Sequence, residues 1–222
     1  MTKAILYKEW IKVRWLLLLV ALIYTATVVF TLVKVNRSFR FAGAVHLWEM
    51  IIQKDLVLID YLKYLPLIGG VLIALGQFVP EMIKRKFKLT LHLPMPHFKP
   101  VVAMMGFGLG SLVVINLCVT LVVSGVLQFK VAPEMLWAWS QALAPCLMAG
   151  LTAYLLTAWI CIEPVWSQRV INGLVGGIVI YLHFLSVPSG GYRFFAPVLL
   201  VLDSLCYLFV FYSVARFRQG AQ

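Results

Sequence analysis

The chain has 222 residues, of which 63% are hydrophobic and 12% are charged, and its formal net charge at pH 7 is +11. A soluble domain is closer to half apolar and a quarter charged, so this composition excludes an ordinary soluble domain and predicts a polytopic membrane protein. The basic residues are dispersed among apolar runs instead of forming one stripe, which argues against nucleic acid as a partner. We expect them to orient the chain or to meet membrane lipid headgroups.

Six apolar runs are candidates to cross the roughly 30 Å of hydrocarbon in a bilayer, and the second of them is short and interrupted by Pro and Gly. They predict spans at residues 16–35, 64–79, 101–128, 135–162, 170–186 and 194–217. Six spans place both termini on one side, and the distribution of Lys and Arg favours the cytoplasmic side. We therefore predict an all-α, multi-pass protein of the cell membrane, in which residues 1–222 form one transmembrane domain with cytoplasmic N- and C-termini.

The first fifteen residues have the pattern of an amphipathic helix on the cytoplasmic face of the membrane. Leu6, Trp10 and Val13 fall on one side of that helix, and Lys8 and Lys12 fall on the other. Lysine side chains of such a helix reach lipid headgroups while its apolar side enters the interface. The alternative is a plain positively charged flank that fixes the orientation of the first span.

The segment 36–63 follows the first span and is too long for a turn. Val45, Trp48, Ile52 and Leu56 recur near helical spacing, with charged residues between them. We predict an external amphipathic helix that lies on, or dips into, the outer leaflet. Such a helix serves either as a gate or substrate-recognition lip, or as a scaffold that packs on the bundle.

A short basic island lies between the second and third predicted spans. Apolar residues recur there at i, i+4 and i+8, at Ile83, Phe87 and Leu91, which predicts a helix over residues 81–93 with one apolar stripe. Pro94 ends that helix, because proline disfavours the helical conformation in the residue before it. The basic charge predicts a cytoplasmic location. The alternative interpretation is an ordinary positively charged loop with an interfacial helix.

This island resembles the cytoplasmic coupling segment between the second and third spans of type-2 ABC transporter permeases. The matching positions are Glu81, Arg85, Leu89, Leu91, Leu93 and Pro94. In that family the segment rests on an ATPase subunit and passes its movement to the membrane helices. The resemblance therefore implies a coupling helix whose partner-binding residues are Glu81, Lys84, Arg85, Phe87, Lys88, Leu89, Leu91, Leu93 and Pro94. Permeases of this family also begin with an elbow helix, and residues 1–15 fit that pattern at Lys8, Glu9, Trp10 and Arg14.

No stretch matches the nucleotide-binding loop G-x-x-x-x-G-K-[ST], so we expect this chain to bind no cofactor of its own. The resemblance implies that ATP and Mg²⁺ are bound by a separate cytosolic ATP-binding cassette ATPase, present in two copies. It also implies that two permeases work as a pair. The second permease is then either another copy of this chain or a related one.

Asp203 is the only acidic residue deep within a predicted span, and a carboxylate there is costly unless it faces the bundle interior or a wet cavity. It is the first candidate for the translocation path, with Asn116 and Gln141 as weaker candidates because polar groups also join helices. The alternatives are that Asp203 is protonated, or bonded to Ser204 or to a neighbouring helix. The four histidines have no catalytic or metal-binding spacing, so we predict neither a catalytic residue nor a metal site.

Two groups of glycines predict close helix packing. Gly106, Gly108 and Gly110 lie in the third apolar run, where the absence of a preceding strand excludes a dinucleotide-binding loop. Gly173 and Gly177 form a small-x-x-x-small pair that suits a helix contact. The four cysteines lie in or at the edge of apolar runs without metal-ligand spacing, so neither a disulfide framework nor a zinc site is predicted.

Together with the resemblance, these features predict a permease subunit of an ATP-binding cassette exporter, which moves a lipid, a hydrophobic peptide, a drug or a similar substrate. ATP hydrolysis is expected in the partner, so the chain itself is not predicted to be an enzyme. The alternative is a six-span membrane enzyme or accessory subunit that acts on lipid without a nucleotide-binding partner.

Overall fold

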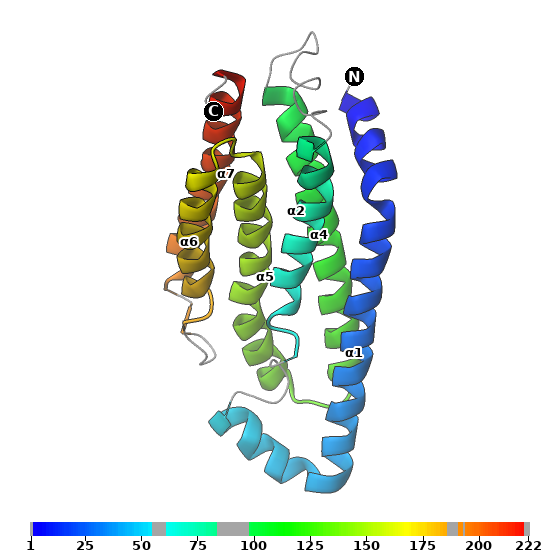
Figure 1. Ribbon diagram of the computed structural model, residues 1–222. Helices are drawn as coiled ribbons and strands as arrows, with labels where there is room; N and C mark the ends of the chain where they lie inside the picture. The colour runs from blue at the N-terminus through cyan, green and yellow to red at the C-terminus, as the bar shows by residue number, and fades with distance from the viewer. Residues whose placement is uncertain (1, 55–60, 84–97, 186–190, 193, 220–222) are drawn as a thin grey trace.

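The structure is a computed structural model that describes residues 2–54, 61–83, 98–185, 191–192 and 194–219. Every regular element within these residues is helical, which confirms the predicted all-α class. In chain order the helices are α1 (Thr2–Lys54), α2 (Leu65–Ile83), α4 (Phe98–Leu127), α5 (Pro133–Ile162), α6 (Trp166–Leu182) and α7 (Ala196–Gln219). They stand side by side, and the end of the bundle that holds both termini also holds the last turns of α2, α5 and α7 (Figure 1).

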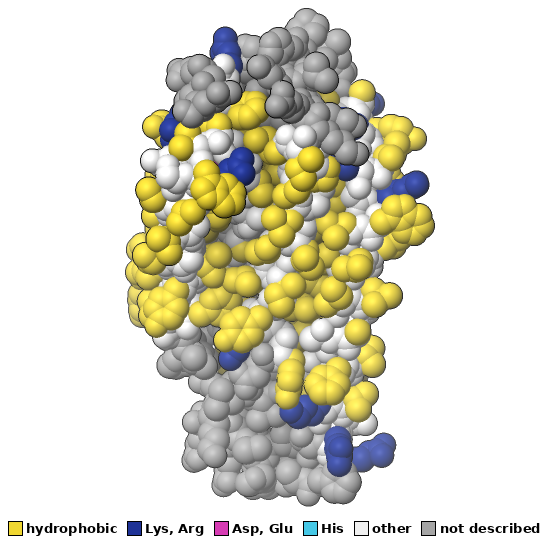
Figure 2. Space-filling model, in the orientation of Figure 1, with side chains coloured by type: hydrophobic (Ala, Val, Ile, Leu, Met, Phe, Trp, Pro, Cys, Tyr) yellow, Lys and Arg dark blue, Asp and Glu magenta, His cyan; other side chains and the backbone are white. Residues whose placement is uncertain are grey.

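Five of these helices are long and apolar enough to cross a membrane. Their apolar segments are Lys3–Arg37, Leu65–Ile83, Phe98–Leu127, Pro133–Ile162 and Ala196–Arg218. α6 has 17 residues, which span about 25 Å, and is shorter than the other five helices. On the face shown in Figure 2, hydrophobic side chains form a broad belt with Lys and Arg side chains toward its two ends. The described helices therefore indicate a multi-pass membrane protein.

The central helix is α5, which packs against α2 on one side and against α6 and α7 on the other. Its contact with α2 is close because two glycines face each other there. A Cβ on Gly70 would overlap the carbonyl oxygen of Gly150, and a Cβ on Gly150 would lie 2.7 Å from Pro66. Small residues at a helix crossing let the two backbones approach, and this contact joins the α1, α2 and α4 half of the bundle to the α5, α6 and α7 half.

The predicted elbow is not a separate element, because α1 runs without a break from Thr2 to Lys54 and its first part stands parallel to the other helices (Figure 1). Val13, predicted on the side of Leu6 and Trp10, instead faces the bundle, while Leu6 and Trp10 are 39% and 52% exposed. No Gly or Pro interrupts residues 1–35, so no sequence signal ends a helix between an elbow and a span. The buried positions form one stripe with spacings of three and four residues: Ile5, Glu9, Val13, Leu17, Val20, Tyr24, Val28, Thr31 and Val35.

The predicted external helix at 36–63 is helical through Lys54, but it continues α1 instead of forming a separate element. This end of α1 turns and runs across the end of the bundle that lies opposite the termini (Figure 1). The side chains of residues 41–54 and the whole of 55–60 lie outside the described residues. The predicted amphipathic pattern therefore stays a prediction.

The predicted boundary between the second span and the coupling helix is displaced. α2 continues through Pro80 and ends at Ile83, whereas the sequence places the end of the span at residue 79. The fixed φ of proline is compatible with a helix, and proline costs the helix chiefly one hydrogen bond and a steric contact. Glu81 therefore belongs to the last turn of α2. The remaining residues of the predicted coupling helix, 84–93, lie outside the described residues.

The two glycine predictions have different outcomes. Gly108 of α4 packs against Tyr154 of α5 and Gln77 of α2, and a Cβ there would lie 2.5 Å from Gln77 Oε1. Four other glycines have no atom within 4 Å of the place where a Cβ would stand, namely Gly106, Gly110, Gly173 and Gly177. The helix contact predicted for the α6 pair is therefore not made by the described part of the chain, since that side of α6 faces outward.

Candidate functional site

Of the predicted coupling residues, the structure describes Glu81, and it places this residue in a group of buried charges. The other predicted coupling residues lie outside the described residues: Lys84, Arg85, Phe87, Lys88, Leu89, Leu91, Leu93 and Pro94. Lys8, Glu9 and Lys12 of α1 converge on Glu81 at the end of the bundle that holds the termini. We call these four residues the terminal charge cluster.

The geometry of the terminal charge cluster joins α1 to the last turn of α2. Lys12 Nζ lies 2.7 Å from Glu9 Oε2 and 3.1 Å from Glu81 Oε1, and Lys8 Nζ lies 2.9 Å from Glu81 Oε1. The Glu9 and Glu81 side chains are 0% and 1% exposed, whereas that of Lys8 is 42% exposed. A buried carboxylate is costly unless it is paired, so the two lysines permit both glutamates to remain charged inside the bundle.

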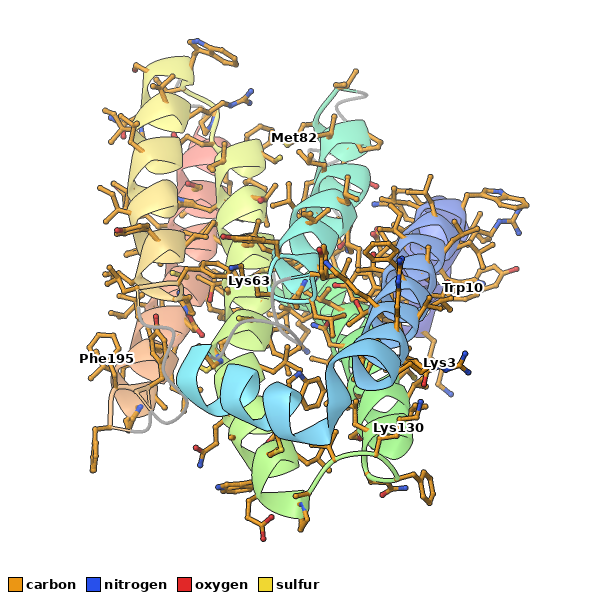
Figure 3. All side chains as sticks on the ribbon, turned by 90° about the horizontal axis from the view of Figure 1, so that it is seen from below. Lys3, Trp10, Lys63, Met82, Lys130 and Phe195 are labelled. Atoms are coloured by element: carbon orange, nitrogen blue, oxygen red, sulfur yellow. The ribbon has the colours of Figure 1, made fainter. Side chains whose placement is uncertain are left out.

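The two other predicted elbow residues face outward from α1. Trp10 lies on the outer surface of the bundle (Figure 3), and the guanidinium of Arg14 lies 5.5 Å from the ring centre of Trp15. Aromatic and basic side chains at the end of a membrane helix are typical of the interface with lipid headgroups. Beside them, a groove of about 530 Å³ runs between α1 and α4, bordered on α4 by Gly106 and Gly110.

A second buried carboxylate ties the other half of the bundle together at the same end. Glu163, just after α5, accepts a hydrogen bond of 2.5 Å from Ser213 Oγ and lies 3.1 Å from Arg216 on α7. Arg169 of α6 donates from Nε to the backbone carbonyl of Glu163 at 2.6 Å. One residue thus connects α5, α6 and α7 where the chain passes from α5 to α6.

Between the two ends, an amide links three helices. Gln77 of α2 donates from Nε2 to the carbonyl of Met104 on α4 at 2.6 Å, and its Oε1 accepts a hydrogen bond of 2.7 Å from the hydroxyl of Tyr154 on α5. Gln77 and Tyr154 are both fully buried. Each polar atom of the Gln77 side chain therefore has a partner, as a polar group in a membrane bundle requires.

Asp203, the first candidate for the translocation path, lies between three helices. Thr152 Oγ1 of α5 lies 2.5 Å from Asp203 Oδ1 on α7, and Nε2 of His183, directly after α6, lies 3.4 Å from the same oxygen. We call Thr152, His183 and Asp203 the Asp203 cluster. The structure thus places Asp203 against neighbouring helices, and the Ser204 hydroxyl donates to the carbonyl of Val201 instead.

Gln141 and Asn116 lie in different places. Gln141 lines a cavity of about 250 Å³ between α5 and the start of α7, on the same side of α5 as the Asp203 cluster. Asn116 of α4 lines a smaller cavity of about 10 Å³ together with Tyr24 and Trp139. Asn116 Oδ1, the Tyr24 hydroxyl and Trp139 Nε1 have no hydrogen-bond partner among the described residues. That cavity is near the lower limit for one water molecule and has polar groups from three helices around it.

Sequence reasoning singled out Asp203, Glu9 and Glu81 but missed most of the residues that form polar contacts between the helices. The missed residues are Lys12 as an ion-pair partner, Gln77, Tyr154, Thr152, Glu163 and His183. For Gln77, Thr152 and His183 the available signal is an isolated polar residue within an apolar run, because such a residue must find a partner on another helix. That signal marks the residues but does not pair them.

No group of three or more His, Cys, Asp or Glu side chains suited to a metal ion occurs in the part of the chain that the structure describes. The cysteines of this part are free thiols. No family model, no curated protein and no solved structure matches this chain.

Proposed function

We propose that the chain is the membrane subunit of an ATP-driven exporter whose ATPase is a separate cytosolic protein. The observation that supports this most directly is the terminal charge cluster. It binds the last turn of α2, which leads into the basic island resembling a permease coupling helix, to the first turns of α1. A force on the island would therefore reach two membrane helices together. ATP and Mg²⁺ belong to the ATPase in this proposal.

The route from the island into the bundle follows the contacts described above. Displacement of the end of α2 acts on α1 through Glu81, and on α5 through the Gly70–Gly150 contact and the Gln77–Tyr154 hydrogen bond. α5 in turn carries Thr152, which contacts Asp203 on α7. The α5–α7 seam, with its cavity beside Gln141, is the proposed translocation path on this chain.

The proposed topology has six spans, with α6 as the shortest, and cytoplasmic termini. The end of the bundle that holds the termini carries Lys3, Lys8, Lys12, Arg14, Lys99, Arg169, Arg216 and Arg218. Positively charged residues next to membrane spans are retained on the cytoplasmic side, so this end would face the ATPase. The chain would work as one of two permeases on two ATPase subunits, as the resemblance implies.

The test begins with copurification of an ATPase on the tagged, full-length chain in native membranes. In the purified assembly, the double substitution Arg85→Glu with Lys88→Glu, or Leu91→Asp alone, should abolish the stimulation of ATP hydrolysis by the membrane subunit. Lys3→Glu is the matched control, because Lys3 is exposed at the same end and lies outside the terminal charge cluster. Unchanged hydrolysis in correctly inserted double variants, or the absence of any ATPase, would contradict the proposal.

The alternative is a membrane enzyme or accessory subunit that acts on lipid without a nucleotide-binding partner. His183 Nε2 lies 3.4 Å from Thr152 Oγ1, a base near a hydroxyl, and this favours a search for such activity. In a catalytic triad, however, the carboxylate binds Nδ1 of the histidine, whereas Nδ1 of His183 bonds to the carbonyl of Val179. Activity of the lone purified chain on a lipid substrate would support the alternative.

A further inference from the structure

The Asp203 cluster brings together groups that are rarely left together inside a membrane. Thr152 and His183 are 0% and 1% exposed, and the side chain of Asp203 is 15% exposed. No lysine or arginine of the described residues forms an ion pair with Asp203, and His183 is its one ionisable partner there. An unpaired carboxylate within a span is costly, so the negative charge of Asp203 must be balanced by a group or a proton inside this site.

The hydrogen bonds fix which atoms of the cluster carry protons. His183 Nδ1 lies 3.1 Å from the carbonyl oxygen of Val179, which accepts only, so the Nδ1 proton is donated there. In a neutral imidazole Nε2 is then an acceptor, and it lies 3.4 Å from Asp203 Oδ1, which in a carboxylate is also an acceptor. Two acceptor atoms therefore lie 3.4 Å apart in a buried site with no proton between them.

The hydroxyl of Thr152 does not resolve this conflict. Its single proton has three acceptors within hydrogen-bond distance, namely Met148 O at 3.0 Å, Asp203 Oδ1 at 2.5 Å and His183 Nε2 at 3.4 Å. Donation to any one of the three leaves the contact between Nε2 and Oδ1 without a hydrogen. One additional proton, on the imidazole or on the carboxyl group, turns that contact into a donor and acceptor pair and leaves the site with no net charge.

The cavity beside Gln141 lies about one helical turn from this site, on the same side of α5. Its lining includes Met148 and Leu199, each one helical turn before a member of the cluster. Tyr192 also lines the cavity, and its hydroxyl donates to the carbonyl of Leu182, next to His183. Toward the termini, α7 carries buried apolar side chains after Asp203, namely Cys206, Val210 and Val214.

The other titratable groups around the cluster are few. Cys206 lies one turn after Asp203 on α7, Tyr192 lies in the segment before α7, and Lys63 precedes α2. Lys63 is half-buried, with its ammonium 5.1 Å from the ring centre of Tyr64. Figure 3 shows Lys63 within the outline of the bundle, near α2 and α5.

We propose that Asp203 and His183 form a proton-binding site, which holds one shared proton at neutral pH and exchanges it through the 250 Å³ cavity. The balance is simple: a proton from water in the cavity adds to an ionised carboxylate and a neutral imidazole, and no bond between heavy atoms changes. The proposal rests on the geometry of α5, α6 and α7 and is independent of whether an ATPase binds the chain.

The first experiment uses the full-length chain in lipid nanodiscs at neutral pH. Infrared spectra should show the carbonyl stretch of a protonated carboxyl group that is lost in Asp203→Asn, or ¹⁵N spectra of labelled histidine should show an imidazolium that is lost in His183→Gln. Glu134→Gln, which removes an exposed carboxyl group at the start of α5, is the matched control and should change neither signal. An ionised Asp203 together with a neutral His183 in the unmodified chain would overturn the proposal.

The second experiment tests the route. Transfer to D₂O should exchange the shared proton quickly, and filling the cavity with Gln141→Trp should slow that exchange at least severalfold. Trp137→Phe, at an exposed position on the same helix, serves as the control and should leave the rate unchanged. Equal exchange rates in the filled and unfilled proteins would disprove access through this cavity. Asp203→Asn supplies the fold control for both experiments, because its amide preserves the shape of the protonated carboxyl group.

Discussion

Two buried carboxylate sites in this bundle are balanced in different ways. In the terminal charge cluster, two glutamates meet two lysines, and the ammonium of Lys12 contacts both acids. In the Asp203 cluster, one carboxylate meets an imidazole and a hydroxyl, and no lysine or arginine of the described chain pairs with it. A cation that is part of the chain cannot leave, whereas a proton can. The first site is therefore suited to a permanent joint between helices and the second to a reversible change of charge.

The largest expected effect comes from removing the shared cation of the first site. Lys12→Met should lower the free energy of unfolding by about 3–5 kcal/mol, because it leaves two acids buried with only the partly exposed Lys8 for compensation. Lys8→Met is the matched variant and should cost about 1 kcal/mol or less, since Lys8 is 42% exposed and contacts Glu81 alone. Unfolding of the purified protein in mixed micelles measures both. If the two variants lose the same free energy of unfolding, Lys12 is not shared between Glu9 and Glu81.

The same site should not tolerate a neutral substitute for its acid. Glu81→Gln keeps the shape of the side chain but removes the charge that Lys8 and Lys12 face, so the expected loss is about 1.5–3 kcal/mol, the contribution of hydrogen bonds to a charged group. Equilibrium unfolding under the same conditions gives the value. A loss near zero would mean that the lysines find equally good partners elsewhere.

The seam between the two halves should be sensitive to a single methyl group. Gly150→Ala places a Cβ 2.7 Å from Pro66, which α2 and α5 can accommodate only by moving apart, at a cost of about 1–3 kcal/mol. Gly173→Ala on α6 is the control, because nothing lies within 4 Å of its Cβ position, and it should be neutral or slightly stabilising. The comparison fails if the two alanine variants unfold at the same denaturant concentration.

The smallest effect is expected at the Asp203 cluster, where we propose that a proton balances the charge. Asp203→Asn should change the free energy of unfolding by less than about 1 kcal/mol, because an amide resembles a protonated carboxyl group in shape and can donate to His183. The contrast with Glu81→Gln is the decisive quantity. If both substitutions cost the same, the two sites are balanced in the same way and the distinction drawn here is wrong.

The positions of the long apolar helices could largely be predicted from the sequence. The predicted fourth span, 135–162, lies within α5 at Pro133–Ile162, because length and hydropathy alone determine which stretches suit a bilayer. The elbow was not confirmed as a separate helix, because an amphipathic helix and the end of a long span share the same periodicity, and which of the two forms depends on what the helix packs against. In α1 that partner is the end of α2, through Glu81.

The pairing of polar residues could not be predicted. Asp203 was a sound candidate because a carboxylate within a span is costly unless it has a partner or a function. Its contact Thr152, however, lies 51 residues away in the chain. Lys12 and Glu81 are separated by 69 residues. Pairs of this kind depend on how each helix is rotated about its axis and on which helices are neighbours, and periodicity within one helix contains neither. The packing of α1 in the bundle, not the sequence, shows that Glu9 faces inward.

α5 makes side-chain hydrogen bonds to α2 through Tyr154 and to α7 through Thr152, and Glu163 at its end bonds to Ser213. Thr152 and Glu163 lie about 16 Å apart along the helix axis, so a sliding displacement of α5 by even one residue would disrupt all three contacts simultaneously. Large-scale shape changes in this protein are thus expected to leave α5 stationary relative to α2 and to be carried by the more weakly attached helices, above all α6, whose outer side contacts nothing in the described chain.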